Sequence, residues 1–495
     1  MKIIGNKLIL ISFLSMSCMG FLYAGDDNHK VNKTKNLDKK LQKIINARNL
    51  TGNAFQGKIT PSIEDPKSQL GMHLFFSKSL SGNRDSACVT CHHPTLGGGD
   101  NLSLPIGVGA QVPDLLGEGR LHDLSATEYD GGPTVPRNAP TTFNLAAWNT
   151  TLFHDGRVEH VNGGTSTPDS GFSIVDPLAG ANLAAAQSRF PLTSPEEMKG
   201  FNHHDKTNQQ IREYVASRLG GYGEGAGELD NPEYWLNKFQ EVYNSEGTAE
   251  ELVTEQNIAD AIGAYENSQT FSNTPWRRYI EGDKNAISTP AKKGALLFFK
   301  SKREGGANCV SCHSGDFFTD EKFHNIAMPQ MGRGKGNGRN GEADFGRYAV
   351  TGNNKDKYAF RTPSLLNVEV TGPWSHTGAY TSLKAVVKHH LNPKKAIQRY
   401  NKYQLDQEGI QNLDKVKKRA RPMLTKLKRD RRAGRDVIRN VKLNKKQIRQ
   451  LVSFLKTLTD PCVKDRECLD KWIPSAEQDP NGDQLDAVDQ HGNLL

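Results

Sequence analysis

Two CxxCH motifs constrain this sequence most: residues 88–92 read CVTCH and residues 309–313 read CVSCH. A c-type haem needs two cysteines for its thioether bonds and one histidine for its iron, and each motif supplies all three. A zinc site would want further cysteine and histidine pairs, which the sequence lacks. We therefore predict two covalently bound c-type haems. The attachment residues are Cys88, Cys91, His92, Cys309, Cys312 and His313.

The first 24 residues have the layout of a secretory signal peptide. Lys2 and Lys7 precede an apolar run, and a polar stretch follows Ala24, after which we expect cleavage. A lipoprotein anchored at Cys18 is the alternative. No later stretch approaches the roughly 20 apolar residues of a membrane span. The expected location is the periplasm, with the signal peptide removed.

The last two cysteines, Cys462 and Cys468, lie in the stretch TDPCVKDRECLDKWIP, which has no histidine near it. Disulfides form and persist in exported proteins. We therefore expect a short-loop disulfide between these two residues, which closes a C-terminal tail over residues 461–495.

The net charge of +9 is unevenly distributed along the chain. Residues 394–456 hold 21 Lys and Arg against 5 Asp and Glu, a local charge of +16, so the rest of the chain carries −7. Two interpretations of this basic segment stay open: a pair of solvated helices, or a docking surface for an acidic redox partner. Nucleic acid is not an expected partner of an exported protein.

An internal repeat surrounds the two motifs. Residues 71–92 (GMHLFFSKSLSGNRDSACVTCH) and 294–313 (GALLFFKSKREGGANCVSCH) share a glycine, an LFF after two intervening residues, a basic loop and the haem motif. Thr289 and Pro290, ahead of the second copy, match a helix start in which an N-cap residue is followed by proline. We expect one haem-binding module to occur twice, each with a helix that leads to the haem.

Apolar residues at helical spacing predict further helices, and few runs alternate as strands do. Long loops rich in Gly, Pro and Asn are expected at 161–186 and 329–356. The expected fold class is mainly α with little β structure: two cytochrome c-like haem domains with long loops, residues 25–280 and 281–460, that meet near 270–288. The predicted helices lie near residue 40 and at 208–219, 232–243, 251–267, 382–391 and 444–458.

The helix expected at 382–391 offers a second iron ligand for the C-terminal haem. His390 falls on an apolar stripe with Leu383 and Val387, whereas His389 lies on another face. We therefore expect His390 to be buried and to ligate iron. His389 is the alternative ligand, and a hydrogen-bonded core histidine is the alternative role.

Several long segments resemble the bacterial di-haem cytochrome c peroxidases and their relative MauG, over nearly all of residues 65–475. The resemblance implies that the N-terminal haem binds peroxide, while the C-terminal haem receives electrons from a small donor protein. It places His390 where typical peroxidases have an axial methionine, and a bis-histidine haem should have a lower potential. The segments are GGGDNLSLPIGVG (97–109), RNAPTTFNLAAWNTTLFHDGR (137–157), FPLTSPEEM (190–198) and FRTPSLLNVEVTGPWSHTGAYTSLKAVVKHH (360–390).

The same resemblance implies a catalytic pair. Glu197 matches a glutamate that takes a proton from one peroxide oxygen and returns it to the other, and Gln187 matches its glutamine partner. Glu196 is the alternative if the register differs by one residue. A helix-capping role with Ser194 is the alternative for Glu197.

The loop after the first haem motif carries a distal histidine in peroxidases that rest inactive, and the matching position here is Val108. Valine cannot ligate iron, and no histidine lies between His93 and His122. We expect a permanently open N-terminal haem that needs no reductive activation.

An electron path and a calcium site also follow from the resemblance. A tryptophan often precedes the DGR motif, where this chain has His154. Electrons would pass through His154, Trp374 or Trp148, or without an aromatic residue. Side-chain and backbone carbonyl oxygens suit calcium. The residues that match the calcium ligands are Asn138, Thr371 and Pro373.

The expected activity is the reduction of hydrogen peroxide to water, with electrons from a periplasmic cytochrome c or cupredoxin. One alternative is a MauG-like oxidase that acts on a protein or organic substrate. Another is a non-enzymatic electron carrier or redox sensor, which would have six-coordinate iron at both sites. The resemblance also allows a homodimer.

Overall fold

The structure is a computed structural model that describes residues 25–126, 128–435, 438–475 and 479–495. The signal peptide expected at residues 1–24 lies outside the described residues. The fold is mainly α, as the sequence predicts. The helices are α1 (Gly25–Ala47), α2 (Pro66–Phe76), α3 (Leu183–Ser188), α4 (Asn208–Gly220), α5 (Pro232–Tyr243), α6 (Ala249–Leu252), α7 (Glu255–Ser268), α8 (Pro275–Glu281), α9 (Thr289–Phe299), α10 (Tyr348–Thr351), α11 (Leu383–Leu391), α12 (Pro393–Gln398), α13 (Val416–Arg432), α14 (Lys445–Lys456) and α15 (Arg466–Leu469).

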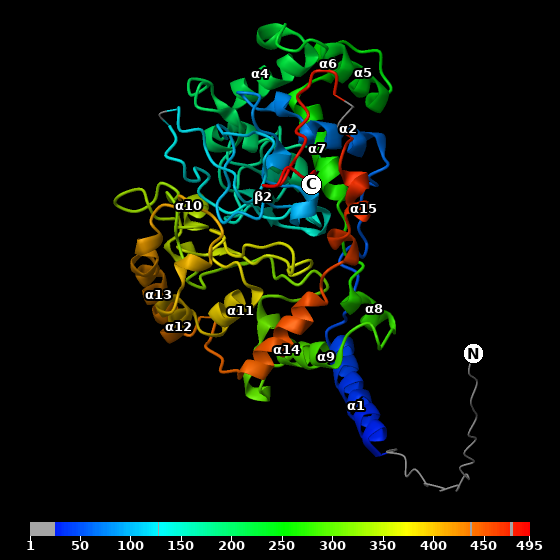
Figure 1. The fold of residues 1–495 in the computed structure, drawn as a ribbon, viewed down its shortest axis with the longest axis vertical. Coiled ribbons are helices and arrows are strands. Elements are labelled where there is room, and N and C mark those ends of the chain that lie inside the picture. The colour runs from blue at the N-terminus through cyan, green and yellow to red at the C-terminus, as the bar shows by residue number, and fades with distance from the viewer. Residues whose placement is uncertain (1–24, 127, 436–437, 476–478) are drawn as a thin grey trace, which may run out of the picture.

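The helices form two lobes, one above the other in Figure 1. The upper lobe contains α2 and α4 to α7, and the lower lobe contains α9 and α11 to α14 (Figure 1). No helix in the described part of the chain is long and apolar enough to cross a membrane.

Two small antiparallel sheets lie among the loops. β1 (Thr151–Leu152), β2 (Val158–Val161) and β3 (Gly164–Ser166) are neighbours in that order, with Leu152 opposite Val158. β4 (Phe323–His324) pairs with β5 (Phe360–Arg361). The turn between β1 and β2 carries the HDGR sequence, so the first sheet positions residues 154–157.

The sequence repeat is present as a helix followed by a haem motif. α2 precedes a 3-10 turn at Cys88–Thr90, and α9 precedes another at Cys309–Ser311. Gly71 of α2 and Gly294 of α9 each lie against a crossing helix, where an added Cβ would overlap a backbone carbonyl oxygen of α7 or of α14. The shared glycine therefore permits the same close helix pair in both lobes, α2 with α7 and α9 with α14.

The two ends of the chain pack on opposite lobes. Leu41 and Ile45 of α1 are buried in the core of the lower lobe, together with Phe454 of α14. Leu485 and Ala487, near the C-terminus, are buried in the core of the upper lobe. Apolar burial thus places α1 in the lower lobe and the C-terminal tail in the upper lobe, which is the reverse of what chain order suggests.

The basic segment is amphipathic and packs on the lower lobe. Ala420, Met423 and Leu427 of α13 are buried in a small cluster with Ile397 of α12. The spacing of these residues leaves the charged side chains on the opposite face of α13. The helices of the basic segment are therefore solvated on one face and packed against the lower lobe on the other.

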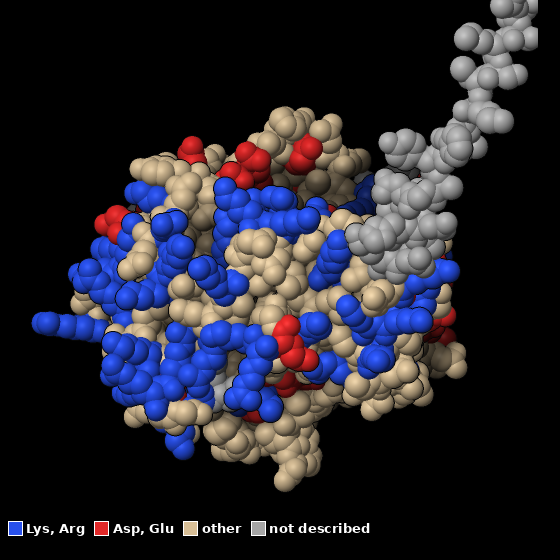
Figure 2. All heavy atoms as spheres, turned by 90° about the horizontal axis from the view of Figure 1, so that it is seen from below, with Lys and Arg blue, Asp and Glu red and all other residues tan. Residues whose placement is uncertain are grey.

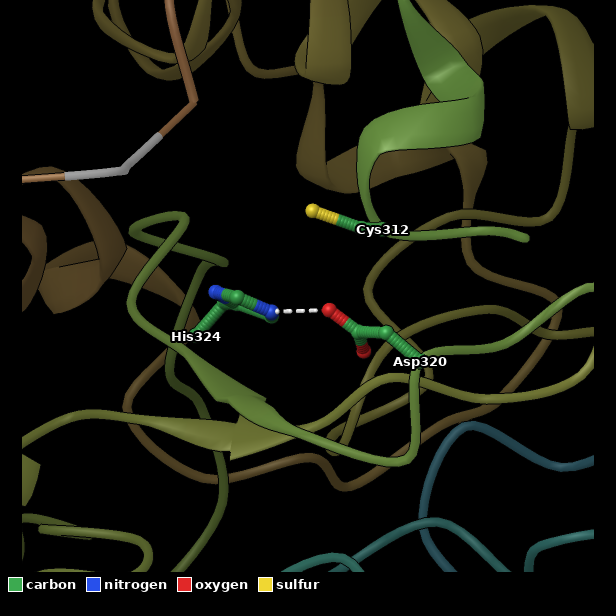
Figure 3. A group of neighbouring side chains, drawn as sticks. All are labelled: Cys312, Asp320 and His324. Carbon is green, nitrogen blue, oxygen red and sulfur yellow. Dashed lines mark hydrogen bonds and ion pairs between the residues drawn. The ribbon is translucent and has the colours of Figure 1, made fainter.

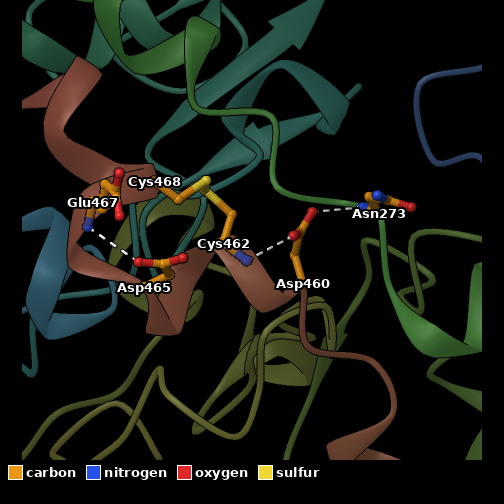
Figure 4. Close-up of a disulfide and its surroundings, with 6 residues drawn as sticks. All are labelled: Asn273, Asp460, Cys462, Asp465, Glu467 and Cys468. Atoms are coloured by element: carbon orange, nitrogen blue, oxygen red, sulfur yellow. Dashed lines mark hydrogen bonds between the residues drawn. A yellow bond between two sulfur atoms is a disulfide. The ribbon is translucent and has the colours of Figure 1, made fainter.

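Cys462 and Cys468 form a disulfide, with the pairing expected from the sequence (Figure 4). Asp460, just ahead of it, accepts hydrogen bonds from the backbone amides of Cys462 at 3.0 Å and Asn273 at 2.6 Å. Asn273 lies in the connection between α7 and α8. The disulfide loop is therefore fastened to the segment that joins the two lobes.

A buried ion cluster links the two halves of the chain. Arg137 Nη1 donates to Asp155 Oδ2 at 2.6 Å, and Arg137 Nε donates to Asp344 Oδ2 at 2.7 Å. Asp344 belongs to the loop 329–356, which follows the second haem motif. Burial favours the neutral carboxyls, but the Arg137 charge outweighs it and lowers the pKa of Asp155 and that of Asp344, the latter to about 2.

We expect Arg137→Met to lower the free energy of unfolding by about 3–5 kcal/mol at pH 7, because two buried carboxylates lose their partner. In the wild type, these depressed pKa values stabilise the fold above about pH 4, and that contribution is lost as the pH falls toward 2. Chemical denaturation between pH 7 and pH 3 measures both effects. The exposed pair of Arg333 with Asp130 provides the control, since Arg333→Met should cost less than about 1 kcal/mol. Equal losses of unfolding free energy in Arg137→Met and Arg333→Met would contradict a stabilising role of the buried ion cluster.

Candidate functional site

A cavity brings the first haem motif together with the two predicted catalytic residues. Cys88, Cys91 and His92 line it, and so do Gln187 and Glu197. The volume of this cavity is about 110 Å³.

The first motif fits a covalent haem in this cavity. Cys88 and Cys91 are free thiols. His92 Nδ1 bonds to the carbonyl oxygen of Gly98 at 3.1 Å, which leaves Nε2 for iron. Such a hydrogen bond fixes the tautomer and orientation of a metal-ligating histidine.

A short π-helical turn, Pro195–Lys199, carries Glu197 into the cavity. Single π turns occur mostly at functional sites. Ser194 Oγ donates to Glu196 Oε2 at 3.1 Å, and Glu196 is not among the cavity-lining residues. Gly107 packs on the same turn, because an added Cβ would overlap the carbonyl oxygens of Glu196 and Glu197. The cavity therefore receives Glu197 rather than Glu196.

Burial raises the pKa of Glu197, and the positive charges of Arg157 and Lys335 oppose that rise. Both cations line the cavity. Lys335 belongs to the loop 329–356, so the second half of the chain supplies a side chain to the first site. A buried carboxyl with a raised pKa suits proton transfer.

Besides Arg137 of the buried ion cluster, sequence reasoning did not single out four charged residues of this cavity. Arg157 had a signal in the DGR motif, whereas Lys335 stood in a glycine-rich loop without any pattern. Glu266 of α7 has its pKa raised to about 8 by burial, and its Oε2 has no hydrogen-bond partner among the described residues. Arg361 is the fourth residue, and its guanidinium lies 3.5 Å from the centre of the Trp148 ring.

Arg120 holds the loop that follows the first haem motif. Its guanidinium is buried and donates to four backbone carbonyl oxygens within 2.8 Å. Val108 lies in this loop, fully buried and outside the cavity lining. Arg120 therefore fixes this loop in place, with the apolar side chain of Val108 at the position that the resemblance matches to a distal histidine. The four acceptor residues are Ile106, Gly107, Pro113 and Leu115.

Two histidines line the first cavity among the described residues, His92 and His154. His154 Nε2 bonds to the carbonyl oxygen of Asn138 at 2.9 Å. His122, the next histidine after the loop, has both ring nitrogens within hydrogen-bond distance of Gly109 and Thr134. His154 and His122 therefore both bond to protein groups.

The second haem motif faces His390. His313 Nδ1 bonds to the carbonyl oxygen of Phe318 at 3.1 Å, and His390 Nδ1 bonds to that of Val386 at 2.9 Å. Both Nε2 atoms are thus left for iron, and the two ring centroids lie 6.3 Å apart. Metal–imidazole bonds of about 2 Å on either side of one ion fit in this space.

The prediction that His390 would be the buried histidine of α11 is wrong. His389 is the fully buried one, and His390 is half-buried. Tyr380 Oη lies 2.8 Å from His389 Nδ1, and the carbonyl oxygen of Ile326 lies 2.9 Å from its Nε2. With both nitrogens occupied, His389 is a structural core histidine, and His390 has the free nitrogen.

Cys312, Asp320 and His324 form a group that has metal-ligand chemistry, shown in Figure 3. His324 Nε2 bonds to Asp320 Oδ2 at 2.8 Å. Burial lowers the pKa of His324, but the hydrogen bond to Asp320 outweighs burial and raises the pKa. Because Cys312 belongs to the second haem motif, the group is better explained as a haem attachment point beside an ion pair.

Trp148 lies between the two motifs. Besides its contact with Arg361, its ring is 5.0 Å from the ring of Phe317, four residues after His313. Trp374 instead donates its indole N–H to the carbonyl oxygen of Val368 at 3.0 Å.

The residues that match calcium ligands come from two neighbouring segments. The backbone amide of Asn138 donates to the carbonyl oxygen of His376 at 3.0 Å. Asn138 Nδ2 donates to the carbonyl oxygen of Leu102 at 2.9 Å, so its Oδ1 is the side-chain atom that could bind a cation. Thr371 and Pro373 lie shortly before His376 in the chain.

Residues 65–285 match the family model described as di-haem cytochrome c peroxidase. MauG, the methylamine utilization protein of Methylorubrum extorquens, is 29% identical over 328 residues, which cover 66% of this chain and 68% of that protein. The cytochrome c551 peroxidase of Nitrosomonas europaea is 26% identical over 330 residues, which cover 67% of this chain and 74% of that protein.

Solved structures share the fold. A MauG-like protein associated with microbial copper homeostasis has a TM-score of 0.53 at 20% identity, covering 83% of this chain and 95% of that chain. The di-haem peroxidase BthA of Burkholderia thailandensis has a TM-score of 0.51 at 18% identity, covering 88% of this chain and 92% of that chain.

Proposed function

We propose that the chain belongs to the family of di-haem cytochrome c peroxidases and MauG, which the family model and the relatives support, and that it reduces hydrogen peroxide to water in the periplasm. The electrons come from a small redox protein, a cytochrome c or a cupredoxin. Each peroxide takes up two electrons and two protons and yields two molecules of water. The observation that carries the proposal is the single cavity that holds His92, Gln187 and Glu197 together.

When bound at His92, the haem iron supplies the peroxide-binding position and the redox chemistry of O–O bond cleavage. Glu197 takes the proton from one peroxide oxygen and returns it to the other, so that the departing oxygen leaves as water. Arg157 and Lys335 favour the carboxylate that accepts the proton, and burial favours the carboxyl that gives it back. The side-chain amide of Gln187 orients the peroxide by hydrogen bonding.

His313 and His390 would hold the second haem, which would supply the redox chemistry for delivering electrons to the first site. The contacts of Trp148 with Arg361 and Phe317 support a path through this residue, with His154 and Trp374 as the alternatives. A calcium ion between Asn138, Thr371 and Pro373 would tie the two segments together beside the first cavity.

Oxidation of a protein or organic substrate, as the MauG relatives suggest, is the second candidate function. His390 favours it, because a histidine ligand in place of methionine lowers the potential of the second haem. In that case the protein would stay oxidised for a long time after peroxide addition without a donor.

Stopped-flow mixing of the haem-loaded protein with hydrogen peroxide and reduced cytochrome c tests the proposal. We expect two molecules of cytochrome c to be oxidised for each peroxide consumed. Peroxide loss without donor oxidation would move the assignment to the second candidate. If no peroxide is consumed with cytochrome c or with hydroquinone, a neutral donor, the enzymatic proposal is wrong.

A further inference from the structure

We propose that the basic face, defined as the exposed Lys and Arg side chains of α12, α13 and α14, is the docking surface for an acidic electron-donor protein. Figure 2 shows Lys and Arg gathered over the lower side of the molecule, with few Asp and Glu among them. The inference rests on the proposed function and adds the chemistry of the donor to it.

Most cations of this segment have no acidic neighbour to neutralise them. Among the described residues, 16 of the 21 Lys and Arg in 394–456 form no ion pair. An ordinary solvated face mixes charges of both signs. A surface with so much unbalanced positive charge attracts and orients an acidic partner. The five paired cations are Lys415, Arg419, Lys426, Arg435 and Lys456, and they share only Glu342, Asp430 and Glu369.

The basic face covers the walls of the second haem site. α11 carries His390, and α12 begins at Pro393, two residues after α11 ends. α14 packs on α9, which leads into the second haem motif, and Val441 just ahead of α14 donates to the carbonyl oxygen of Leu391 at 2.9 Å. A donor bound to this face is therefore brought next to the haem that receives electrons.

A groove in the basic face suits acidic side chains. It lies between α13 and residues 337–343, with a volume of about 290 Å³. Arg339, Lys415, Lys418 and Arg419 line it, against a single carboxylate, Glu342. Each carboxylate of a partner that enters would meet more than one cation, which favours charge-assisted hydrogen bonds.

A protein fits this face better than a lipid surface does. Helices that bind at a membrane surface expose Trp, Phe or Leu beside their cations. Among the large exposed apolar side chains of the described residues, Tyr403 alone falls within 394–456. Positive charge without apolar anchors points to electrostatic docking of a soluble partner.

Two donors with the same haem and opposite charge provide the test. Reduced cytochrome c is basic, and its lysine-succinylated form is acidic. With peroxide at low ionic strength, we expect kcat/KM to be at least about tenfold higher for the succinylated form. That preference should disappear in about 0.5 M salt, where the Debye length falls to a few ångströms. Equal rates at low salt, or a preference for the basic form, would overturn the proposal.

A fourfold variant, Lys417→Gln, Lys418→Gln, Lys445→Gln and Lys446→Gln, removes four exposed charges from the basic face. We expect it to lower kcat/KM for succinylated cytochrome c about tenfold. Its affinity for the oxidised donor, measured by calorimetry without peroxide, should weaken by a similar factor. The matched variant with arginine at all four positions should keep both values. If the arginine variant also lost kcat/KM and affinity for the donor, an interface based on charge would be contradicted.

Two controls separate this inference from the proposed function. Hydroquinone carries no charge, so its turnover should be the same in the wild type and in both variants. If hydroquinone supports turnover while neither donor depends on salt, the docking inference fails and the peroxidase stands. The inference would also be overturned if the wild type co-sedimented with vesicles of anionic lipid, the glutamine variant did not, and neither donor were preferred. That result would assign the basic face to a membrane.

Discussion

Replacing Glu197 by glutamine is expected to lower kcat for peroxide reduction by about 10²–10⁴-fold, because the amide can neither take up nor return a proton. Glutamine keeps the size of the side chain and its place on the π-helical turn, so the haem spectra should stay as in the wild type. Stopped-flow measurement of peroxide consumption with reduced cytochrome c gives the rate, and EPR monitors the haem.

Glu196→Gln is the matched control for this variant. Its carboxylate accepts a hydrogen bond from Ser194 and does not line the cavity, so we expect a rate close to that of the wild type. If Glu196→Gln were the slower of the two, the register of the catalytic turn would be wrong by one residue. If neither variant were slow, the proton would be carried by another group, and Glu266 is a candidate that lines the same cavity.

Replacing His390 by alanine is expected to convert the second haem from low-spin to high-spin, because one of its two axial nitrogens is lost. Donor-dependent peroxide turnover should fall strongly with it, since the electron-entry haem would have an altered potential and an open coordination position. The ferric EPR spectrum and a potentiometric titration measure the two effects.

His389→Ala separates ligation from folding. This side chain fills a buried site between Tyr380 and the carbonyl oxygen of Ile326, so its loss should cost about 2–4 kcal/mol of stability through a cavity and unpaired polar groups. The low-spin signal of the second haem should survive. If His389→Ala lost the low-spin signal while His390→Ala kept it, His389 would be the iron ligand and His390 the structural histidine.

The repeat of helix and haem motif could be predicted from the sequence because all of its signals are local. Gly71 and Gly294 precede the first cysteine of their motifs by 17 and 15 residues, and each proved to be a point of close helix packing. The predicted helix at 251–267 was less accurate. It is split into α6 and α7 because the Thr254 side chain accepts the backbone amide of Asn257 and caps a new helix.

Tertiary contacts account for what the sequence did not predict. The helical stripe grouped His390 with Leu383 and Val387, but Ile326 and Tyr380, from outside α11, cover His389 instead. Lys335 reaches the first cavity across the two halves of the chain, and no periodicity marks such a residue. Arg120 likewise has no pattern around it in the sequence, because only the fold brings its four carbonyl acceptors together.

The EPR spectrum of the oxidised, haem-loaded protein tests the central claim most directly. The claim is that the first haem is open to peroxide while the second is closed by His390. We predict a high-spin and a low-spin signal in equal amounts as isolated, and we expect peroxide to change the high-spin signal without prior reduction of the protein. Two low-spin signals, or a high-spin signal that peroxide leaves untouched, would contradict the account.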